Sequence, residues 1–139
     1  MRVLIAAAAA ALVCTSVAAA KEFHPGDLRV CGATKCVAIT NRAALRSFSS
    51  FIYMGPQPAT SPSPSLGAPT FELRFRNGYV AGIVASARLD RFLSYGVYLG
   101  RFVRGTWYAM PARASAELRR LTRSLAPFSL TQASLDKSR

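Results

Sequence analysis

The sequence predicts an α+β fold, in which a small antiparallel β-sheet is covered by two or three α-helices and follows an N-terminal signal peptide. One observation is a strictly alternating hairpin around Asn77-Gly78, and another is a pair of segments whose apolar residues recur at helical spacing. The third is size, since 139 residues with 51% hydrophobic content suffice for one small domain. Strands and helices in separate stretches are typical of this fold class.

Residues 1–20 have the pattern of a secretory signal peptide. A basic start precedes an apolar run over residues 3–13, and the segment ends at Ala20 with a small-x-small cleavage site. We expect cleavage after Ala20, so that the mature chain is exported and is either secreted or associated with the cell envelope. Two alternatives are an uncleaved N-terminal anchor and a lipid attached to Cys14.

The rest of the chain is expected to form one domain over residues 21–128, followed by a polar, frayed tail over residues 129–139. Residues 55–69 are rich in Pro and Ser. They predict an exposed linker within the domain, because proline is excluded from helix interiors and central strands. No stretch of the mature chain is long and apolar enough to predict a membrane span.

Two cysteines follow the leader, Cys31 and Cys36, and they flank four residues between apolar segments. This spacing predicts a short hairpin whose strands meet at the cysteines, close enough for a disulfide. Outside the cytosol such a bond would persist. A metal site is not expected, because His24 is the only histidine and the two cysteines are assigned to the disulfide.

Two helices are predicted with clear boundaries. The first is capped by Thr40 or Asn41 and ends before Gly55-Pro56. Its apolar face consists of Ala44, Leu45, Phe48, Phe51 and Ile52. A polar strip beside that face consists of Arg42, Arg46, Ser49 and Tyr53. The last helix begins at Pro111 and ends at Pro127, and its apolar face consists of Ala114, Leu118, Leu121 and Leu125.

The hairpin is the clearest local signal. Alternation from residue 71 onward, followed by Asn77-Gly78, predicts two strands joined by a two-residue type I′ turn. The face predicted to be buried consists of Phe71, Leu73, Phe75, Val80 and Val84. The opposite face consists of Glu72, Arg74, Arg76, Tyr79, Ala81 and Ile83. Gly82 in the middle of a strand predicts a bulge or the close approach of a helix.

The segment after the hairpin is predicted from weaker signals. A short helix is expected from Ser86 to Gly96, with Leu89, Phe92 and Leu93 facing inward. Residues 97–99 are expected to be extended, and residues 102–110 to contain a further strand.

Catalytic chemistry has little support in the sequence. The candidates are Glu72 and Asp90 as a carboxylate pair, and His24 as the only imidazole. Each of the two acids also has a neighbouring arginine, so an ion pair on the surface would account for its presence without a catalytic role. The glycine spacing matches neither dinucleotide-binding nor phosphate-binding loops, so no cofactor is predicted.

Arginine is the most distinctive feature of the composition. The chain has 18 Lys plus Arg against 6 Asp plus Glu, a formal net charge of +12, and most of the cations are arginine. Arginine side chains suit the bidentate binding of phosphate or carboxylate. The predicted anion-binding residues are Arg74, Arg76, Arg119, Arg120 and Arg123. Tyr79 and Trp107 are predicted to add aromatic contacts. The alternative is a solvated basic surface without a specific ligand.

Together these features favour a small exported, non-enzymatic module that binds an anionic partner at the cell envelope. The partner would be an anionic lipid surface or an acidic wall polymer, since export removes most nucleic acid from reach. One alternative is a small secreted hydrolase that acts on a wall or sugar polymer. Another is a structural or assembly protein that makes contacts through its linker and tail. A binding module should present a shallow surface of arginines and aromatic rings, whereas an enzyme should hold a carboxylate or His24 in a pocket.

Overall fold

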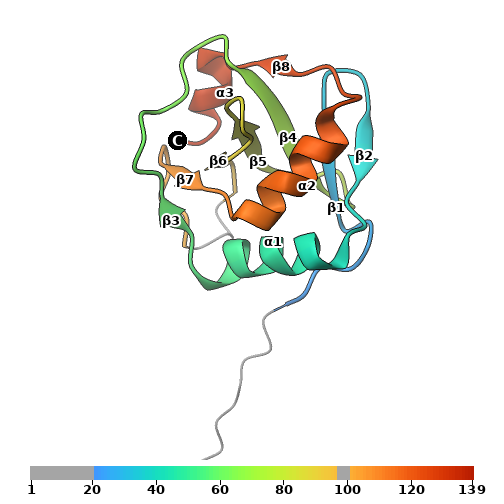
Figure 1. Ribbon diagram of the computed structural model, residues 1–139. Coiled ribbons are helices and arrows are strands. Elements are labelled where there is room, and N and C mark those ends of the chain that lie inside the picture. The colour runs from blue at the N-terminus through green and yellow to red at the C-terminus, as the bar shows by residue number, and fades with distance from the viewer. Residues whose placement is uncertain (1–20, 97–100) are drawn as a thin grey trace, which may run out of the picture.

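The computed structural model describes residues 21–96 and 101–139, which form an antiparallel sheet with helices on both faces (Figure 1). The predicted signal peptide and the extended segment expected at residues 97–99 lie outside the described residues. The strand order is β2-β1-β4-β5-β6-β7-β3, with β8 paired to β4. The strands are β1 (Leu28–Cys31), β2 (Cys36–Ala38), β3 (Gln57–Pro58), β4 (Pro69–Phe75), β5 (Val80–Ala85), β6 (Arg91–Ser94), β7 (Trp107–Ala109) and β8 (Phe128–Ser129). The predicted α+β class is confirmed.

Helices α1 (Arg42–Met54) and α2 (Ala112–Thr122) lie side by side on the front face of the sheet. The predicted start of α1 is confirmed, because the Asn41 side chain accepts a hydrogen bond from the Ala44 N–H at 3.0 Å and satisfies a free amide of the first turn. The predicted apolar face of α1 is buried. It packs against Leu73, Val84 and Phe92 of the central strands, and this layer is the larger of the two core clusters.

Helix α2 begins after Pro111, as predicted, but it ends at Thr122 rather than at Pro127. The Thr122 hydroxyl donates to the Leu118 carbonyl at 2.7 Å, and the Leu125 N–H then donates to the Thr122 carbonyl at 3.0 Å. A hydroxyl that bonds the backbone in this way competes with the continuing helix. Leu125 is still buried, although it lies in the turn that follows the helix.

The back face of the sheet is also covered, which corrects the prediction of a frayed tail over residues 129–139. Strand β8 and helix α3 (Gln132–Asp136) occupy this segment. Leu130 is 2% exposed and belongs to a second core cluster with Ile83, Leu93 and Trp107. Ile83 and Ala85 of β5, Leu93 of β6 and Trp107 of β7 are apolar and belong to this cluster, so the sheet needs a cover on that side as well. Trp107 is therefore a core residue, which corrects its predicted role as an exposed aromatic contact.

The central hairpin of β4 and β5 has the predicted orientation. Phe71, Leu73 and Val84 are buried on the face that the helices cover. Phe75 and Val80, at the turn end of the hairpin, are only half-buried. The prediction that all five residues are buried therefore holds for the middle of the hairpin and not for its tip.

The turn of this hairpin differs from the predicted type I′ turn. The Phe75 N–H donates to the Tyr79 carbonyl at 2.8 Å, so the loop contains three residues instead of two. Type I′ requires positive φ at both central positions, but in this loop only Gly78 has it, at +86°. The arrangement is a type I turn followed by a left-handed glycine, which is the usual three-residue solution. It places Arg76 in the loop, at the exposed tip of the hairpin.

A bulge within the hairpin explains one further difference. The pairing shifts by one residue between Leu73 and Arg74, and Ala81 enters the buried front cluster although alternation predicts it on the other face. Next to it, a Cβ on Gly82 would lie 2.2 Å from the Leu93 carbonyl oxygen. Of the two predictions for Gly82, the bulge is found beside it, whereas the predicted approach of a helix is wrong because the close neighbour is strand β6.

The short helix predicted from Ser86 to Gly96 is wrong. A turn over residues 86–90 leads into β6, which pairs with β5 and β7. Phe92 and Leu93 point to opposite faces of the sheet, and both faces are apolar. A strand that is buried on both sides cannot be distinguished from a helix by its periodicity.

One edge of the sheet carries the predicted disulfide, and the other carries a strand, β3, that the sequence does not predict. Cys31 and Cys36 are register partners of β1 and β2, and the predicted disulfide joins them. The Pro/Ser-rich stretch is irregular except for β3 and for Pro69, which begins β4. Strand β3 pairs with β7 at the other edge, where proline is tolerated. Among the described residues, no helix has the length and hydropathy that crossing a membrane requires.

Candidate functional site

Four aromatic side chains from separate parts of the chain form a continuous row. Residues 21–27 precede β1, and we call them the N-terminal arm. Phe23 of this arm lies between Tyr53 of α1 and Phe75 of β4, and its ring centroid is 5.6 Å from that of Tyr53 and 6.1 Å from that of Phe75. Phe75 stacks on Tyr79 at 6.3 Å. These separations are typical of favourable aromatic pairs. The row lines an open groove of about 740 Å³, which we call the aromatic groove.

The N-terminal arm is fixed by hydrogen bonds. The Phe23 N–H donates to the Ser49 Oγ at 3.0 Å, and this hydroxyl donates to the Leu45 carbonyl at 3.0 Å. Ser49 belongs to the predicted polar strip of α1, yet it is buried because the arm covers it. The Asp27 carboxylate accepts a hydrogen bond from the His24 N–H at 2.8 Å and so closes the turn before β1.

Two cations lie beside the aromatic row. Lys21 and Arg76 line the groove, together with Asp27 and Asn77. Within residues 21–96 and 101–139 neither Lys21 nor Arg76 forms an ion pair, so both charges are available to a ligand. The Tyr53 hydroxyl is neutral at physiological pH, as tyrosine ordinarily is, and burial raises its pKa further, so it is able to donate a hydrogen bond.

Two of the five predicted anion-binding arginines are paired within their own elements. The Arg74 Nε donates to the Glu72 carboxylate at 2.8 Å. Arg120 makes two hydrogen bonds to Glu117, at 3.0 and 2.8 Å, and these bonds raise the pKa of its guanidinium. An arginine with such a partner has less to offer to an external anion.

The other three predicted arginines line grooves. Arg76 lies in the aromatic groove, next to Tyr79, the one predicted aromatic contact that the structure leaves exposed. Arg119 and Arg123 lie in a second groove beside α2. The structure therefore separates the two hairpin arginines, Arg74 and Arg76, from Arg119, Arg120 and Arg123, and it leaves part of each group accessible.

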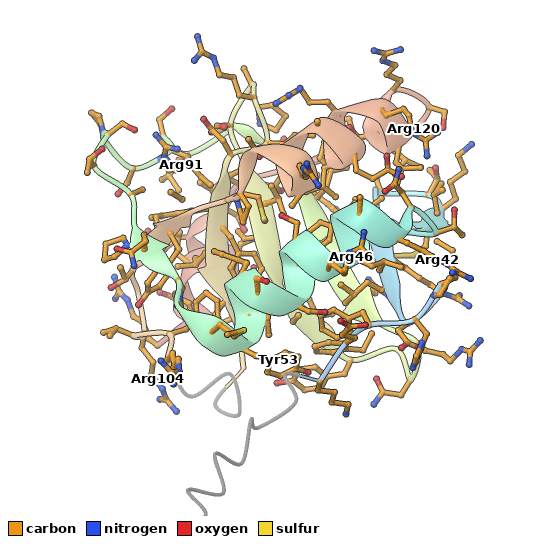
Figure 2. All side chains as sticks on the ribbon, turned by 60° about the horizontal axis from the view of Figure 1, so that its bottom comes forward. Arg42, Arg46, Tyr53, Arg91, Arg104 and Arg120 are labelled. Atoms are coloured by element: carbon orange, nitrogen blue, oxygen red, sulfur yellow. A yellow bond between two sulfur atoms is a disulfide. The ribbon has the colours of Figure 1, made fainter. Side chains whose placement is uncertain are left out.

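The outer surface of the helical layer is strongly basic. Figure 2 shows Arg42 and Arg46 on α1 and Arg120 on α2, all on this side of the molecule. The exposed arginines of the two helices are Arg42, Arg46, Arg113, Arg119 and Arg120, and Arg123 is exposed at the C-cap of α2. Glu117 is the only carboxylate in either helix. Arg42, Arg46 and Tyr53 share one strip of α1, so a basic track leads toward the aromatic groove.

The three catalytic candidates are not part of this site. Glu72 is paired on the back face of β4. Asp90 accepts a hydrogen bond from the Ser86 hydroxyl at 2.6 Å and pairs with Arg91 at 3.3 Å. His24 is exposed in the N-terminal arm. None of the three lines the aromatic groove or the groove beside α2.

Several residues of the aromatic groove are not predicted from the sequence. Lys21, Phe23 and Asp27 lie in an arm without regular periodicity, and Tyr53 is counted only as part of a polar strip. Two signals were present, since Phe23 is an isolated aromatic residue in a polar segment and Tyr53 shares a helical strip with two arginines. Neither signal shows that the two rings meet.

The fold and the groove define a small, disulfide-bonded α+β protein with an aromatic and cationic surface. Comparison of the chain with known protein families, with curated protein sequences and with solved structures finds no match. The groove itself is therefore the feature of the molecule that bears on its function.

Proposed function

We propose that the protein is an exported, non-enzymatic binding module that recognises an acidic polysaccharide of the cell envelope through the aromatic groove. The observation that carries the proposal is the convergence of four aromatic rings with Lys21 and Arg76. These groups come from the N-terminal arm, helix α1 and the β4–β5 hairpin. The local structure of these three elements does not by itself bring the groups together; tertiary packing does.

The chemistry of the groove suits sugar rings that bear carboxylates. The C–H face of a pyranose ring packs on an aromatic face, which offers a large apolar area in a fixed orientation. Arg76 can bind a uronic acid carboxylate through two parallel N–H groups, and Lys21 adds a point charge. Asn77 and the neutral Tyr53 hydroxyl can bond sugar hydroxyls.

The surroundings favour a polymer over a lipid surface. The groove is concave, so flat contact with a membrane would leave its rings uncovered. The basic strip of α1 extends the positive surface beyond the groove and suits a ligand longer than one sugar. The net charge of +12 would also attract a polyanion from a distance.

A hydrolase is less well supported by the same groove. Asp27 is the only carboxylate among the described residues that line it, and its side chain accepts the His24 N–H. Glycoside hydrolysis ordinarily uses two carboxylates across one cleft.

Calorimetric binding of a hexameric oligogalacturonate at two salt concentrations tests the proposal. We expect Arg76→Ala to weaken binding about tenfold and to reduce the salt dependence, because one charge-assisted contact is removed. Tyr79→Ala should weaken binding by a similar factor, whereas Tyr79→Phe keeps the ring and should bind nearly as well as the wild type.

Arg113→Ala provides the matched control, since Arg113 is an exposed arginine of α2 that does not line the aromatic groove. Equal losses for Arg76→Ala and Arg113→Ala would show only general attraction to anions and would contradict the proposal. Equal affinity for linear polyphosphate, which has no rings, would contradict the role of the aromatic row. Binding to anionic vesicles but not to the oligosaccharide would point to a lipid surface instead.

A further inference from the structure

A second groove lies between α2 and the end of the β4–β5 hairpin that is remote from its turn. Its apolar floor includes Phe71 and Leu89, which are 7% and 5% exposed, and its volume is about 430 Å³. Arg119, in the last turn of α2, and Arg123, the C-cap residue of α2, line it. No carboxylate is among its described lining residues. We call it the arginine groove.

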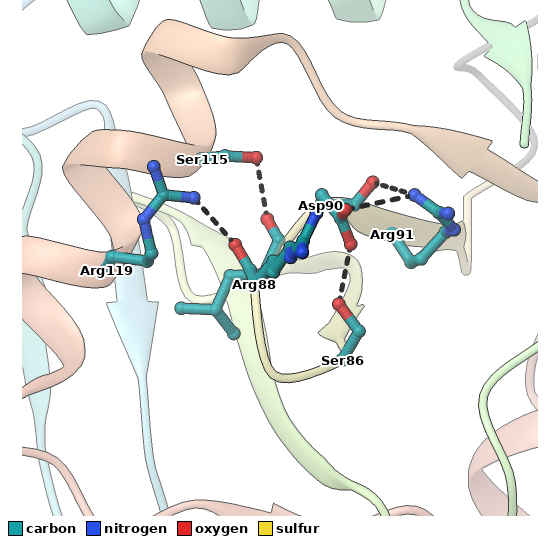
Figure 3. A network of polar contacts seen from close by, with 7 residues as sticks. Ser86, Arg88, Asp90, Arg91, Ser115 and Arg119 are labelled. Carbon is teal, nitrogen blue, oxygen red and sulfur yellow. Dashed lines mark hydrogen bonds and ion pairs between the residues drawn. The ribbon is translucent and has the colours of Figure 1, made fainter.

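The wall opposite α2 is a strained turn that side-chain hydrogen bonds hold in one shape (Figure 3). Ser86 and Leu89 have φ angles of +103° and +53°, which residues with a side chain rarely adopt. The Ser115 hydroxyl donates to the Leu89 carbonyl at 2.9 Å, and Arg119 donates to the Arg88 carbonyl at 3.0 Å. Such strain persists only where the surroundings fix the backbone, so this wall is preorganised relative to α2.

The nearest acid does not compete with the arginines of the groove. Asp90 is occupied by the Ser86 hydroxyl and by Arg91, which Figure 3 shows on the side of the turn away from Arg119. Arg119 uses one N–H for the Arg88 carbonyl and keeps other donors of its guanidinium. Arg123 is exposed and forms no ion pair within the described residues.

The two grooves lie at opposite ends of one hairpin. Phe71 lines the arginine groove and Phe75 the aromatic groove, and both side chains are on the front face of β4. Phe75 lies four positions after Phe71, which is about 13 Å along a strand. Each groove thus joins an apolar side chain of β4 to cations on a neighbouring element.

We propose that the arginine groove is a second site for the same acidic polysaccharide, with a sugar ring on the floor of Phe71 and Leu89 and its carboxylate on Arg119 and Arg123. The inference takes its class of ligand from the proposed function, but it depends on different residues. Two sites on one small protein would raise its affinity for a long polymer, because the second contact forms at high effective concentration.

The test is an NMR titration of the ¹⁵N-labelled protein with digalacturonic acid, a ligand short enough to occupy a single groove. We expect two groups of amide shifts, one around Tyr79 and one around Leu89, each with its own saturation. Arg123→Glu should abolish the group around Leu89 and leave the group around Tyr79. Arg113→Glu, the same charge change on α2 outside the arginine groove, should abolish neither.

Arg123→Glu keeps the hydrogen bond between Arg119 and the Arg88 carbonyl, and an unchanged thermal midpoint would show that the turn is intact. Shifts around Tyr79 without any around Leu89, or Leu89 shifts that survive Arg123→Glu, would overturn the second site alone. Shifts around Leu89 without any around Tyr79 would overturn the aromatic groove and support the arginine groove. No shifts at all would overturn both.

Discussion

Ser49 shows how a single hydroxyl connects the fold to the candidate site. It is 3% exposed, and it joins the Phe23 N–H to the Leu45 carbonyl of α1. Phe23 in turn supports the rings of Tyr53 and Phe75. Ser49 is therefore a positioning residue, which acts on the groove through the arm.

We predict that Ser49→Ala lowers the free energy of unfolding by about 1–3 kcal/mol, because the buried Phe23 N–H loses its acceptor. It should also weaken oligogalacturonate binding, although Ser49 does not line the groove. Chemical denaturation and calorimetry measure the two effects, and Ser49→Thr, which keeps the hydroxyl, should recover most of the binding. Unchanged binding in Ser49→Ala would show that the arm does not need this bond.

Tyr95 makes the free energy of unfolding depend on pH in the alkaline range. Burial raises its pKa from the ordinary 10.0 to about 12, although the hydrogen bond with Ser134 acts in the opposite direction. The folded state thus holds the proton more tightly than the unfolded state. The stability due to neutral Tyr95 is complete below pH 10 and is lost as the pH rises toward 12.

Urea denaturation at pH 8 and at pH 11 measures this loss. Tyr95→Phe cannot ionise, so we expect the variant to lose less stability between the two pH values than the wild type. The same loss in both proteins would contradict the assignment to Tyr95.

Residue type alone did not separate surface aromatics from core aromatics. Tyr79 and Trp107 are both predicted as contacts, but Tyr79 lies at the exposed hairpin tip and Trp107 lies under Leu130 on the back face. The difference depends on how the C-terminal segment folds back over the sheet. That contact is tertiary, so it cannot be predicted from a local sequence pattern.

At the scale of elements, the disulfide acts on one edge of the sheet. It joins β2 to β1, and β1 is also paired with β4. Because the closed loop is short, we predict that Cys31→Ala with Cys36→Ala lowers stability by about 2 kcal/mol in the chain-entropy account. The rest of the sheet should remain folded.

Denaturation and amide exchange check this prediction. Faster exchange should be confined to β2 and the adjacent loop. Complete unfolding of the double variant in buffer would show that the hairpin is essential to the whole domain, contrary to this account.

Elements whose sequence signals agree could be predicted, and elements with two competing signals could not. Helix α1 has a cap, an apolar face and a glycine-proline end, and all three agree. Strand β6 lacks such agreement, since its apolar residues serve two sheet faces and match helical spacing equally well. The hairpin lies between these cases, because Asn77-Gly78 predicts a turn there but does not fix the length of the loop.

At the scale of the whole molecule, the candidate site is assembled from parts that are far apart in the sequence. Phe23, Tyr53 and Tyr79 each come from a different element. The predicted Arg76 and Tyr79 lie in the groove because both are at one hairpin tip. The arm and the end of α1 are brought there by packing, so a sequence pattern cannot place them.

The start of the mature chain bears on this site as well. We predict from the Ala20 cleavage site that the exported protein begins at Lys21. Its α-amino group would then lie two residues before the fixed Phe23, at the rim of the aromatic groove. Intact-mass measurement of the exported protein tests this start, and a full-length mass in the membrane fraction would favour an uncleaved anchor.

The proposed function requires that sugar rings pack on the aromatic row. The most direct measurement is a set of intermolecular NOEs between hexameric oligogalacturonate and the ring protons of the labelled protein. We predict NOEs from sugar ring protons to Tyr53 and Tyr79, and their loss in Arg76→Ala at equal ligand concentration. Binding without any NOE to these rings, with small shifts spread over all exposed arginines, would contradict the claim and leave only a solvated basic surface.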